Sequence, residues 1–352
     1  MSNSISFSSL SCPMPKFDFD TINMGHGSGG ILTHQLLNSG VFSILQNDML
    51  NQKHDGAIFT ANGKLAFSTD SYVIHPLFFP GGNIGELAVN GTVNDLAMCG
   101  AMAKYLSLSF IIEEGLAMKE FWEILVSIKK ACDKANVQVV TGDTKVVEKG
   151  KGDKIFINTS GIGIMHPHAN IALSNIKEGD AVILSGYIAD HGVCIMSKRE
   201  GLEFETDVKS DTVNLNFTIE HLLNEFGNEI HFLRDATRGG VASVLNEIAK
   251  DGNLGVDILE KEIPVKPQVS GACEMLGLDP LYVANEGKFM MVVDAAKTQD
   301  VLNALRKDTN GTDATIIGHI TKEHIGQVIL QSRIGGKRVV NMLPGEQLPR
   351  IC

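Results

Sequence analysis

The sequence predicts an α/β or α+β protein of two domains, and three observations support this. A chain of 352 residues exceeds the usual size of one hydrophobic core, so two domains of about 150 residues each are expected. Short apolar runs typical of buried strands alternate with segments whose apolar residues recur at helical spacing. The alternation starts again after a polar turn at 177–180, which places the domain boundary near residue 170.

The first half combines a glycine-rich loop with alternating strands and helices. Residues 25–30 hold too much glycine for regular structure, and the apolar residues after them predict a helix. Asn62-Gly63, between two apolar runs, predicts a hairpin that ends near Asp70. The expected elements are a loop over 25–30, a helix over 31–37, a hairpin over 57–67, a helix over 84–98, a strand over 106–112, a helix over 121–135, and a strand over 137–140 that ends in the loop 141–144.

The second half repeats the alternation and ends in a tail. Its expected elements are a strand over 181–184, an acidic loop at Arg234-Asp235, a helix from Gly239-Gly240 to residue 249, and strands over 288–293 and 315–318. Residues 335–352 contain three Gly and two Pro with little periodicity, which indicates a flexible tail. The expected division is a glycine-rich segment (1–40), an N-terminal domain (41–170), a C-terminal α/β domain (171–335) and the tail (336–352).

Composition excludes several classes of protein. The formal net charge of −11 comes without a long basic run, so nucleic acid is not an expected partner. Residues 1–10 have no basic region, and no stretch approaches the roughly 18 apolar residues of a membrane helix, so a cytoplasmic protein without a membrane partner is expected. Six cysteines without a C-x-x-C pair argue against a zinc ribbon or a disulfide scaffold. Cys352 differs from the other five because it is the last residue.

Four aspartates, Asp70, Asp95, Asp143 and Asp235, lie at or near the ends of expected elements, among small residues. Such carboxylates can converge on Mg²⁺ ions that bridge nucleotide phosphates, since Mg²⁺ prefers oxygen ligands. Their alternative role is that of ordinary turn and cap residues. Gly239-Gly240 before a helix can offer backbone N–H groups to a phosphate, aided by Arg234 or Arg238. The sequence has no Walker A loop and no protein-kinase motif set, so any use of ATP requires another fold.

Eight motifs spread over nearly the whole chain resemble those of one family. They are GHGSGG (25–30), STDS (68–71), PGGNIG (80–85), NGTVNDLA (90–97), TGDTKVV (141–147), RDATRGG (234–240), NEGK (285–288) and PRIC (349–352). The chain resembles the HypE family of hydrogenase maturation proteins, which is similar to aminoimidazole ribonucleotide synthetase, selenophosphate synthetase and thiamin-phosphate kinase. The internal motifs point to this superfamily, and the last four residues point to HypE. The resemblance implies an ATP-binding two-domain fold.

The resemblance also implies a site. The N-terminal domains should pair in a homodimer, and ATP with Mg²⁺ should lie in a cleft lined by the aspartates. The implied nucleotide-binding residues are Asp70, Asn94, Asp95, Gly142, Asp143, Arg238, Gly239 and Gly240. The implied metal ligands are Asp70, Asp95, Asp143, Asp235 and Asp55.

The activity implied by the resemblance is ATP-dependent dehydration of a carbamoyl group on Cys352 to a thiocyanate, which supplies the cyanide ligand of [NiFe]-hydrogenase. The carbamoyltransferase HypF would load the thiol, and the HypC-HypD complex would accept the cyanide. Phosphorylation of the carbonyl oxygen turns a very poor leaving group into phosphate. Glu286 is the expected base for the nitrogen proton, with Lys145 as the group that orients or protonates. An exposed ion pair is the alternative role of both.

Two other functions remain open at this stage. A sibling ATP-dependent enzyme, either selenophosphate synthetase or a small-molecule kinase, would need neither Cys352 nor its context, and the loop 25–30 has no adjacent Cys to handle selenium. A non-catalytic scaffold that only carries a cyanide precursor would not need the aspartate motifs or Glu286. ATP turnover by carbamoyl-loaded protein distinguishes the three.

Overall fold

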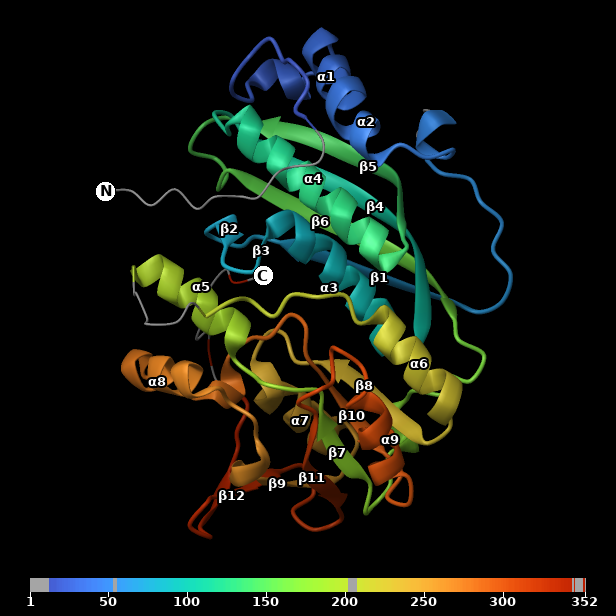
Figure 1. The fold of residues 1–352 in the computed structure, drawn as a ribbon, viewed down its shortest axis with the longest axis vertical. Helices are drawn as coiled ribbons and strands as arrows, with labels where there is room; N and C mark the ends of the chain where they lie inside the picture. The colour runs from blue at the N-terminus through green and yellow to red at the C-terminus, as the bar shows by residue number, and fades with distance from the viewer. Residues whose placement is uncertain (1–12, 53–55, 202–207, 344, 346–350, 352) are drawn as a thin grey trace.

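The computed structural model describes residues 13–52, 56–201, 208–343, 345 and 351. The chain forms an N-terminal and a C-terminal domain, drawn one above the other in Figure 1. Helix α3 (Ile84–Met98) lies between them, where it packs against β1 and β6 of the first domain and against α6 and β8 of the second.

A four-stranded sheet in the order β1-β6-β4-β5 forms the N-terminal domain. Its strands are β1 (Leu65–Tyr72), β4 (Ala101–Glu113), β5 (Gln138–Val147) and β6 (Ile155–Met165). Helices α3 and α4 (Met118–Ala135) cover one face of this sheet. Buried and half-exposed residues therefore alternate along β6, as expected when only one face of a sheet is covered. We call the face opposite α3 and α4 the open face.

A seven-stranded sheet in the order β13-β12-β9-β11-β7-β10-β8 forms the C-terminal domain. Its strands are β7 (Ala181–Leu184), β8 (Ile230–Asp235), β9 (Gly255–Leu259), β10 (Phe289–Val293), β11 (Thr315–Thr321), β12 (Val328–Gln331) and β13 (Lys337–Val339). Met290 and Val292 of β10 belong to the core under α7 (Gly240–Asp251), whereas Met291 and Val293 belong to the core under α6 (Asn216–Phe226) and α9 (Thr298–Leu305). Helices therefore cover both faces of this sheet.

The remaining elements are short or flank the two sheets. They are α1 (Ile31–Gln35), α2 (Phe42–Leu45), α5 (Asp190–Glu200), α8 (Pro267–Leu276), the two-residue strands β2 (Phe78–Phe79) and β3 (Gly82–Asn83), a π-helical turn over Leu36–Val41, and 3-10 turns at Met24–Gly27, Leu50–Gln52, Leu173–Asn175, Glu260–Glu262 and Pro280–Tyr282. In the described part of the chain, no helix is both long and apolar enough to span a membrane.

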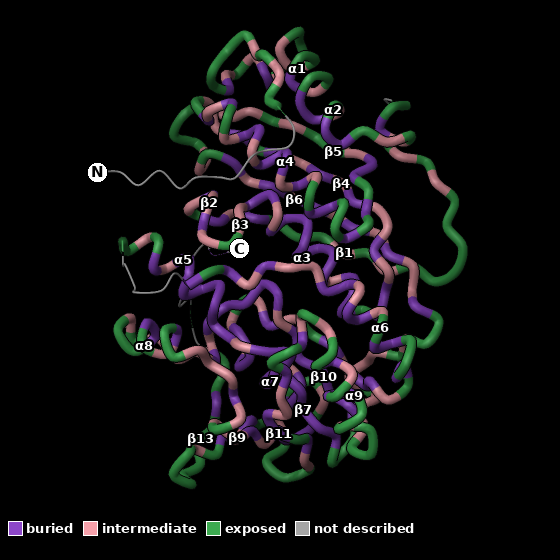
Figure 2. The backbone as a smooth tube through the Cα atoms, in the orientation of Figure 1, coloured by how far each residue is buried: buried purple, intermediate pink, exposed green. Residues whose placement is uncertain are grey.

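Helix α3 is buried along almost its whole length, because it has a protein domain on each side (Figure 2). Only Glu86 and Asp95 of its fifteen residues are not buried. The side chain of Asn83 accepts hydrogen bonds from the N–H groups of Gly85 and Glu86 and so caps its start. Because α3 lies between the domains, its partly exposed Asp95 carboxylate lies at the domain junction.

Most of the expected elements are confirmed, including the bounds 84–98 and 181–184. The hairpin over 57–67 is wrong. Its second run is β1, but β1 pairs with β6 and the first run forms no strand. The loop over 141–144 is also wrong, since β5 continues through these residues to Val147. Within the glycine-rich loop, residues 24–27 form a 3-10 turn.

The tail is partly ordered, unlike the expected flexible segment. Residues 337–339 form β13, and Val340 is fully buried. Ile351 is only 4% exposed, and its main-chain oxygen is hydrogen-bonded to His191. Pairing with the neighbouring strand β12 fixes the first part, and a contact with the distant His191 fixes the second.

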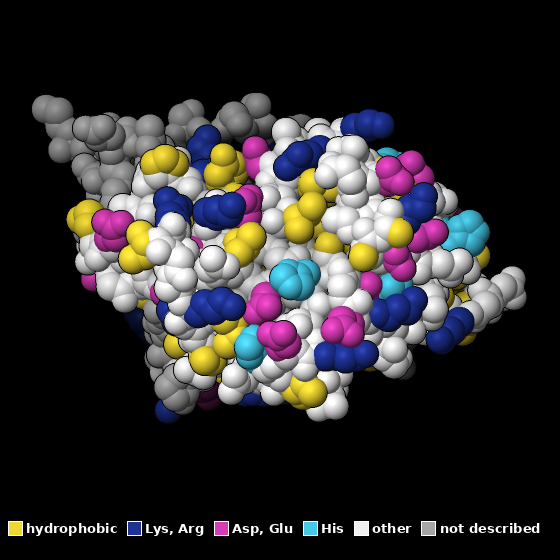
Figure 3. All heavy atoms as spheres, turned by 90° about the horizontal axis from the view of Figure 1, so that it is seen from below, with side chains coloured by type: hydrophobic (Ala, Val, Ile, Leu, Met, Phe, Trp, Pro, Cys, Tyr) yellow, Lys and Arg dark blue, Asp and Glu magenta, His cyan; other side chains and the backbone are white. Residues whose placement is uncertain are grey.

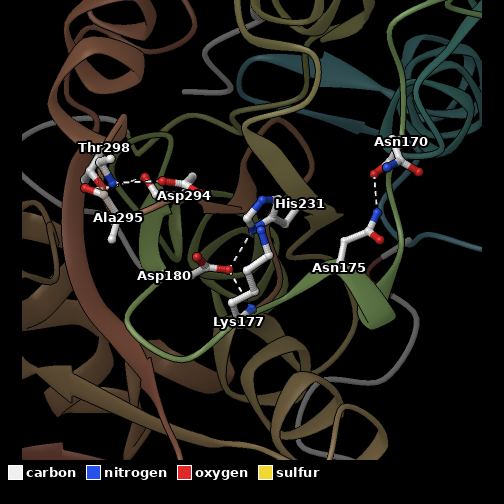
Figure 4. A network of polar contacts seen from close by, with 9 residues as sticks. Asn170, Asn175, Lys177, Asp180, His231, Asp294, Ala295 and Thr298 are labelled. Carbon is white, nitrogen blue, oxygen red and sulfur yellow. Dashed lines mark hydrogen bonds and ion pairs between the residues drawn. The ribbon is translucent and has the colours of Figure 1, made fainter.

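A buried polar pair stabilises the start of the C-terminal domain (Figure 4). His231 Nδ1 lies 2.7 Å from Asp180 Oδ2, and the same oxygen accepts a hydrogen bond from the Lys177 N–H. The side chains of His231 and Asp180 are 6% and 3% exposed. Both polar groups are thus paired with each other away from water.

Candidate active site

Three aspartates from three elements lie near one another at the domain junction. Asp70 is on β1, Asp95 is on α3, and Asp235 is the last residue of β8. Ser68 and Asp70 lie on the same face of β1, because they are two residues apart. The Ser68 hydroxyl donates a 2.7 Å hydrogen bond to Asp95 Oδ2, so this face points toward α3. Together with Glu286, described below, these aspartates form what we call the carboxylate cluster.

Burial and mutual repulsion raise the pKa of two aspartates of the cluster, Asp95 and Asp235. Burial, and next the negative charge of Asp95, raises the pKa of Asp235 to about 7. Burial also raises the pKa of Asp95; the hydrogen bond from Ser68 opposes this, and the charge of Asp70 adds to it. Carboxylates that repel one another are stabilised by a cation, and Mg²⁺ prefers oxygen ligands of this kind. The donor set therefore fits a divalent cation.

Glu286 lies at the same junction, in a loop held by close contacts. Its N–H donates to Asp211 Oδ1 at 3.1 Å, and a Cβ at Gly287 would lie 2.0 Å from the Asp211 main-chain oxygen. The Glu286 side chain is buried, and Oε1 has no hydrogen-bond partner among the described residues. Burial, followed by the charges of Asp211 and Asp235, raises the pKa of Glu286 well above its ordinary value. A raised pKa makes the ionised form of this carboxylate a stronger base.

The turn before α7 offers a place for phosphate beside the cluster. Helix α7 begins at Gly240, five residues after Asp235. Gly239 and Gly240 have φ values of +77° and +61°, and a Cβ at Gly240 would lie 2.5 Å from the Leu281 oxygen. Glycine is therefore required for this turn. The N–H groups that open α7 and the exposed Arg238 next to them suit an anionic ligand.

Asn94 has a different role in the structure from nucleotide binding. Its Nδ2 donates to the main-chain oxygens of Val213 and Glu286, and its Oδ1 accepts from the Leu215 N–H. The residue is 1% exposed. Since both N–H groups and the oxygen of this amide are bonded within the protein, Asn94 holds α3 to the Glu286 loop.

Asp143 and Lys145 lie away from the cluster. In the sheet register, Asp143 pairs with Ser109, which pairs with Asn158, which pairs with Ser71. Ser71 is the residue next to Asp70 on β1, and neighbouring side chains in a strand point to opposite faces of the sheet. Asp143 is therefore on the open face, and Asp70 is on the face covered by α3 and α4. The two edge strands are three strand spacings apart, about 14 Å. Within one chain, Asp143 does not join the other aspartates.

Lys145 instead forms an exposed ion pair. Its Nζ lies 2.8 Å from Asp143 Oδ1, and the two side chains are 63% and 58% exposed. This hydrogen bond is the main cause that lowers the pKa of Asp143. In the single chain, Lys145 thus has the alternative role considered for it, an exposed ion pair. Glu286 is buried and has no ion pair with any described residue.

A cavity of about 230 Å³ lies at the β5 edge of the N-terminal domain. Its lining residues are Gly27, Gly29, Thr33, Leu37, Val41, Phe42, Leu50, Leu108, Phe110, Val139, Thr141, Gly142, Asp143, Thr144 and Lys145. A Cβ at Gly142 would lie 2.0 Å from the Leu108 oxygen, so glycine is needed where β5 approaches β4. Apolar walls with a few polar groups at one end are typical of small-molecule sites. Such a cavity suits the base of a nucleotide.

The described residues do not assemble a metal site by themselves. No group of three or more His, Cys, Asp or Glu in this part of the chain lies close enough to hold an ion. A divalent cation there would need phosphate oxygens or water as further ligands, as Mg²⁺ commonly has. Asp55 and Cys352 lie outside the described residues.

Several residues of the site are not apparent from the sequence. Ser68 lies within the STDS motif, where its bond to Asp95 could have been suspected. Asp190, His191 and Asp211 belong to none of the motifs, and no local spacing marks them. They reach the junction through the tertiary fold.

Comparisons with known proteins agree with this fold and site. Two family models match the chain, the AIR synthase related protein N-terminal domain over residues 53–165 and the corresponding C-terminal domain over residues 177–331. Thiamine monophosphate kinase from Aquifex aeolicus shares the fold, with a TM-score of 0.56 at 19% identity over 77% of this chain and 89% of that one. The fold and site thus define an AIR synthase related protein.

Relatives of higher sequence identity show to which family of AIR synthase related proteins the chain belongs. Carbamoyl dehydratase HypE of Bradyrhizobium diazoefficiens is 46% identical over 94% of this chain and 96% of its own length, and HypE of Escherichia coli K12 is 42% identical over 95% and 100%. A crystal structure of hydrogenase maturation protein HypE in complex with ATP has a TM-score of 0.90 at 44% identity, over 94% of this chain and 99% of that one. The chain belongs to the HypE family.

Proposed function

We propose that this protein uses ATP to dehydrate an S-carbamoyl group on Cys352 to a thiocyanate, the source of the cyanide ligand in a [NiFe]-hydrogenase. The observation that carries the proposal is the buried Glu286. Its Oε1 has no hydrogen-bond partner in the described part of the chain, and it lies at a junction that also holds Asp70, Asp95 and Asp235 and the described end of the tail. Relatives named carbamoyl dehydratase support the same reaction.

The reaction has two steps. First, the carbonyl oxygen of Cys352–S–C(=O)–NH₂ attacks the γ-phosphorus of ATP; an O–P bond forms, the bond to the bridging oxygen breaks, and ADP leaves. One nitrogen proton is lost as the C=N bond forms. Second, the nitrogen loses its other proton, the C–O bond breaks and phosphate leaves, which gives Cys352–S–C≡N. Carbamoyl and ATP become thiocyanate, ADP and phosphate, so no oxidant or reductant is required.

The residues of the chain divide these tasks. Glu286 Oε1 takes a nitrogen proton, because it has no hydrogen-bond partner among the described residues and because burial raises the pKa of this carboxylate. Arg238 and the N–H groups that open α7 hold the phosphates. Asp70, Asp95 and Asp235 would hold Mg²⁺ together with phosphate oxygens, and the ion would offset charge on the transferred phosphoryl group. The HypE crystal structure in complex with ATP supports ATP as the nucleotide.

A homodimer built through the N-terminal domains would complete this site. Exposed apolar side chains lie on the sheet of this domain, among them Phe67 (69%), Ile111 (46%) and Leu65 (44%). The lower face of the molecule, by contrast, mixes charged side chains of both signs with isolated apolar ones (Figure 3). Because Asp143 and Lys145 lie on the open face and at the far edge, they would serve the cluster of a second copy. The metal role of Asp143 and the catalytic role of Lys145 rest on this arrangement.

The partners and compartment follow the same proposal. HypF would supply the carbamoyl group, which is supported by a structure of a HypE-HypF complex with a TM-score of 0.77 at 43% identity over 89% of this chain and 100% of that one. The HypC-HypD complex would accept the cyanide. Among the described cysteines, Cys99, Cys132 and Cys273 are free thiols, in keeping with a reducing compartment such as the cytoplasm.

ATP turnover by carbamoyl-loaded protein tests the proposal. We expect one ADP released for each carbamoyl group converted, and no turnover by unloaded protein. A small-molecule kinase or selenophosphate synthetase would hydrolyse ATP whether or not the protein carries a carbamoyl group. A carrier scaffold would release no ADP with or without the carbamoyl group. Either result would contradict the proposed function.

A further inference from the structure

A histidine that the proposed reaction does not use holds the end of the chain. The Ile351 main-chain oxygen lies 2.6 Å from His191 Nε2, and the Ile351 side chain is 4% exposed. We propose that His191 is a positioning residue that docks the C-terminal segment so that the thiol of Cys352, the next residue, is presented to Glu286. We call His191, Ser210 and Ile351 the tail clamp. This inference rests on the proposed function and deepens it.

The hydrogen bonds of the tail clamp define the state of the imidazole ring. A carbonyl oxygen only accepts, so His191 Nε2 carries the hydrogen. Nδ1, which lies 2.7 Å from Ser210 Oγ, then accepts from that hydroxyl. Burial lowers the pKa of His191, which favours this neutral form. The Phe79 ring packs edge-on against the imidazole at 5.6 Å, so the ring is held from the side as well.

A short strip of chain connects the tail clamp to Glu286. The Ser210 N–H donates to the Pro80 oxygen at 2.8 Å, which fixes Ser210 against the N-terminal domain. The next residue, Asp211, accepts the Glu286 N–H, and its main chain lies against Gly287. The charge of Asp211 opposes the burial that lowers the pKa of His191, and it adds to the burial that raises the pKa of Glu286, as expected if this carboxylate is near both. A tail held by His191 is therefore held near Glu286.

Buried carboxylate oxygens without a hydrogen-bond partner in the described chain lie on residues around the tail clamp. Asp190 and Asp211, the sequence neighbours of His191 and Ser210, each have one buried carboxylate oxygen without a partner in the described chain, and so does Glu286. Buried acceptors without partners are unfavourable, so such a site favours a ligand that donates. A carbamoyl nitrogen carries two N–H groups. Docking the loaded tail would bring these donors to a place that has unpaired acceptors.

Alkylation of Cys352 in the full-length protein tests the docking. Iodoacetamide labelling is followed by the mass of the C-terminal peptide, with the exposed Cys99 as the reference within each sample. His191→Phe fills the same space without a donor, and Ile351→Ala removes the docked side chain at a position where the fold is not at risk. Loss of one buried hydrogen bond corresponds to a change of about tenfold in the docking equilibrium. We therefore expect about tenfold faster labelling in His191→Phe, and faster labelling in Ile351→Ala as well, because less apolar surface then holds the docked tail.

A rescue variant and a second readout separate positioning from a structural role. In His191→Gln the amide nitrogen reaches the place of Nε2, so we expect labelling near the wild-type rate. With carbamoyl-loaded protein and saturating ATP, His191→Phe should convert the adduct about tenfold more slowly while its Kd for ATP stays unchanged.

Two results would overturn the inference. One is labelling at the wild-type rate in both His191→Phe and Ile351→Ala, which would show that the tail is not docked by these contacts. The other is faster labelling with conversion at the wild-type rate, which would make the contact a resting place only. If wild-type protein fails to convert the adduct, the proposed function fails, and the labelling experiment still decides whether His191 docks the tail.

Discussion

The ionisation of Asp235 makes the pH dependence of nucleotide binding a quantitative prediction. Burial beside Asp95 raises the pKa of Asp235 to about 7. The carboxyl group must be ionised to hold Mg²⁺ with the phosphates, so the affinity is proportional to its ionised fraction. That fraction rises from about one tenth at pH 6 to about nine tenths at pH 8, and the affinity should rise about tenfold with it.

The raised pKa of Asp235 also makes the stability of the folded protein depend on pH. The unfolded chain ionises Asp235 near pH 4, whereas the folded protein retains the proton up to about pH 7. The contribution of this group to stability is therefore fully present below pH 4 and is lost as the pH rises toward 7, in protein without metal. Mg²⁺ and nucleotide should oppose this loss, because they favour the ionised form.

Calorimetry of Mg·ATP binding at pH 6, 7 and 8 measures the effect in wild type and in Asp235→Asn. ATP itself changes its protonation over this pH range, but this affects the wild type and the variant equally. The difference between their two pH profiles therefore reports the ionisation of Asp235 alone. We expect the variant to bind more weakly at pH 8 and to lose the tenfold rise. Asp257→Asn, on β9 beside His319, is the matched control and should keep the wild-type profile. A pH profile that is the same in Asp235→Asn and wild type would refute the assignment.

Three further predictions address the tail, the second copy and the fold. Cys352→Ala should abolish cyanide formation but leave ATP binding intact; normal yields of mature hydrogenase would contradict this. Asp143→Asn should weaken Mg·ATP binding in the dimer, and an unchanged calorimetric affinity would remove Asp143 from the site. His231→Ala should lower the free energy of unfolding by about 3 kcal/mol in urea, because Asp180 stays buried without its partner. The exposed His319→Ala should change it by less than about 0.5 kcal/mol, and equal effects of the two would refute the reasoning.

Elements whose signals are local could be predicted from the sequence. Helix α3 has its expected bounds because Asn83 caps its first turn and Gly100, with φ of +78°, follows its end. The sequence also indicates the aspartates of β1, α3 and β8 as candidates, because each lies near an element end among small residues; their role as metal ligands stays a prediction. In the fold, β1 and β8 both pack against α3, which brings the three aspartates to the same junction.

Features that depend on strand order could not be predicted. The Asn62-Gly63 turn signal failed because β1 finds its partner in β6, roughly a hundred residues later. Asp143 resembles Asp70 in local sequence, yet the order β1-β6-β4-β5 puts them on opposite edges and opposite faces. The ordered end of the tail depends on His191, 160 residues before Ile351. No pattern within a window of ten residues contains such information.

The most direct test of the proposed chemistry uses Glu286→Gln. This variant keeps the shape of the side chain and should still bind Mg·ATP, but it lacks a base typically worth 10² to 10⁴ in rate. Mass spectrometry of the C-terminal peptide, after carbamoyl loading and ATP addition, reports the reaction at Cys352 itself. We predict that wild type loses the mass of one water while the adduct persists in Glu286→Gln. Conversion at the wild-type rate in the variant would contradict the role of Glu286 as the base.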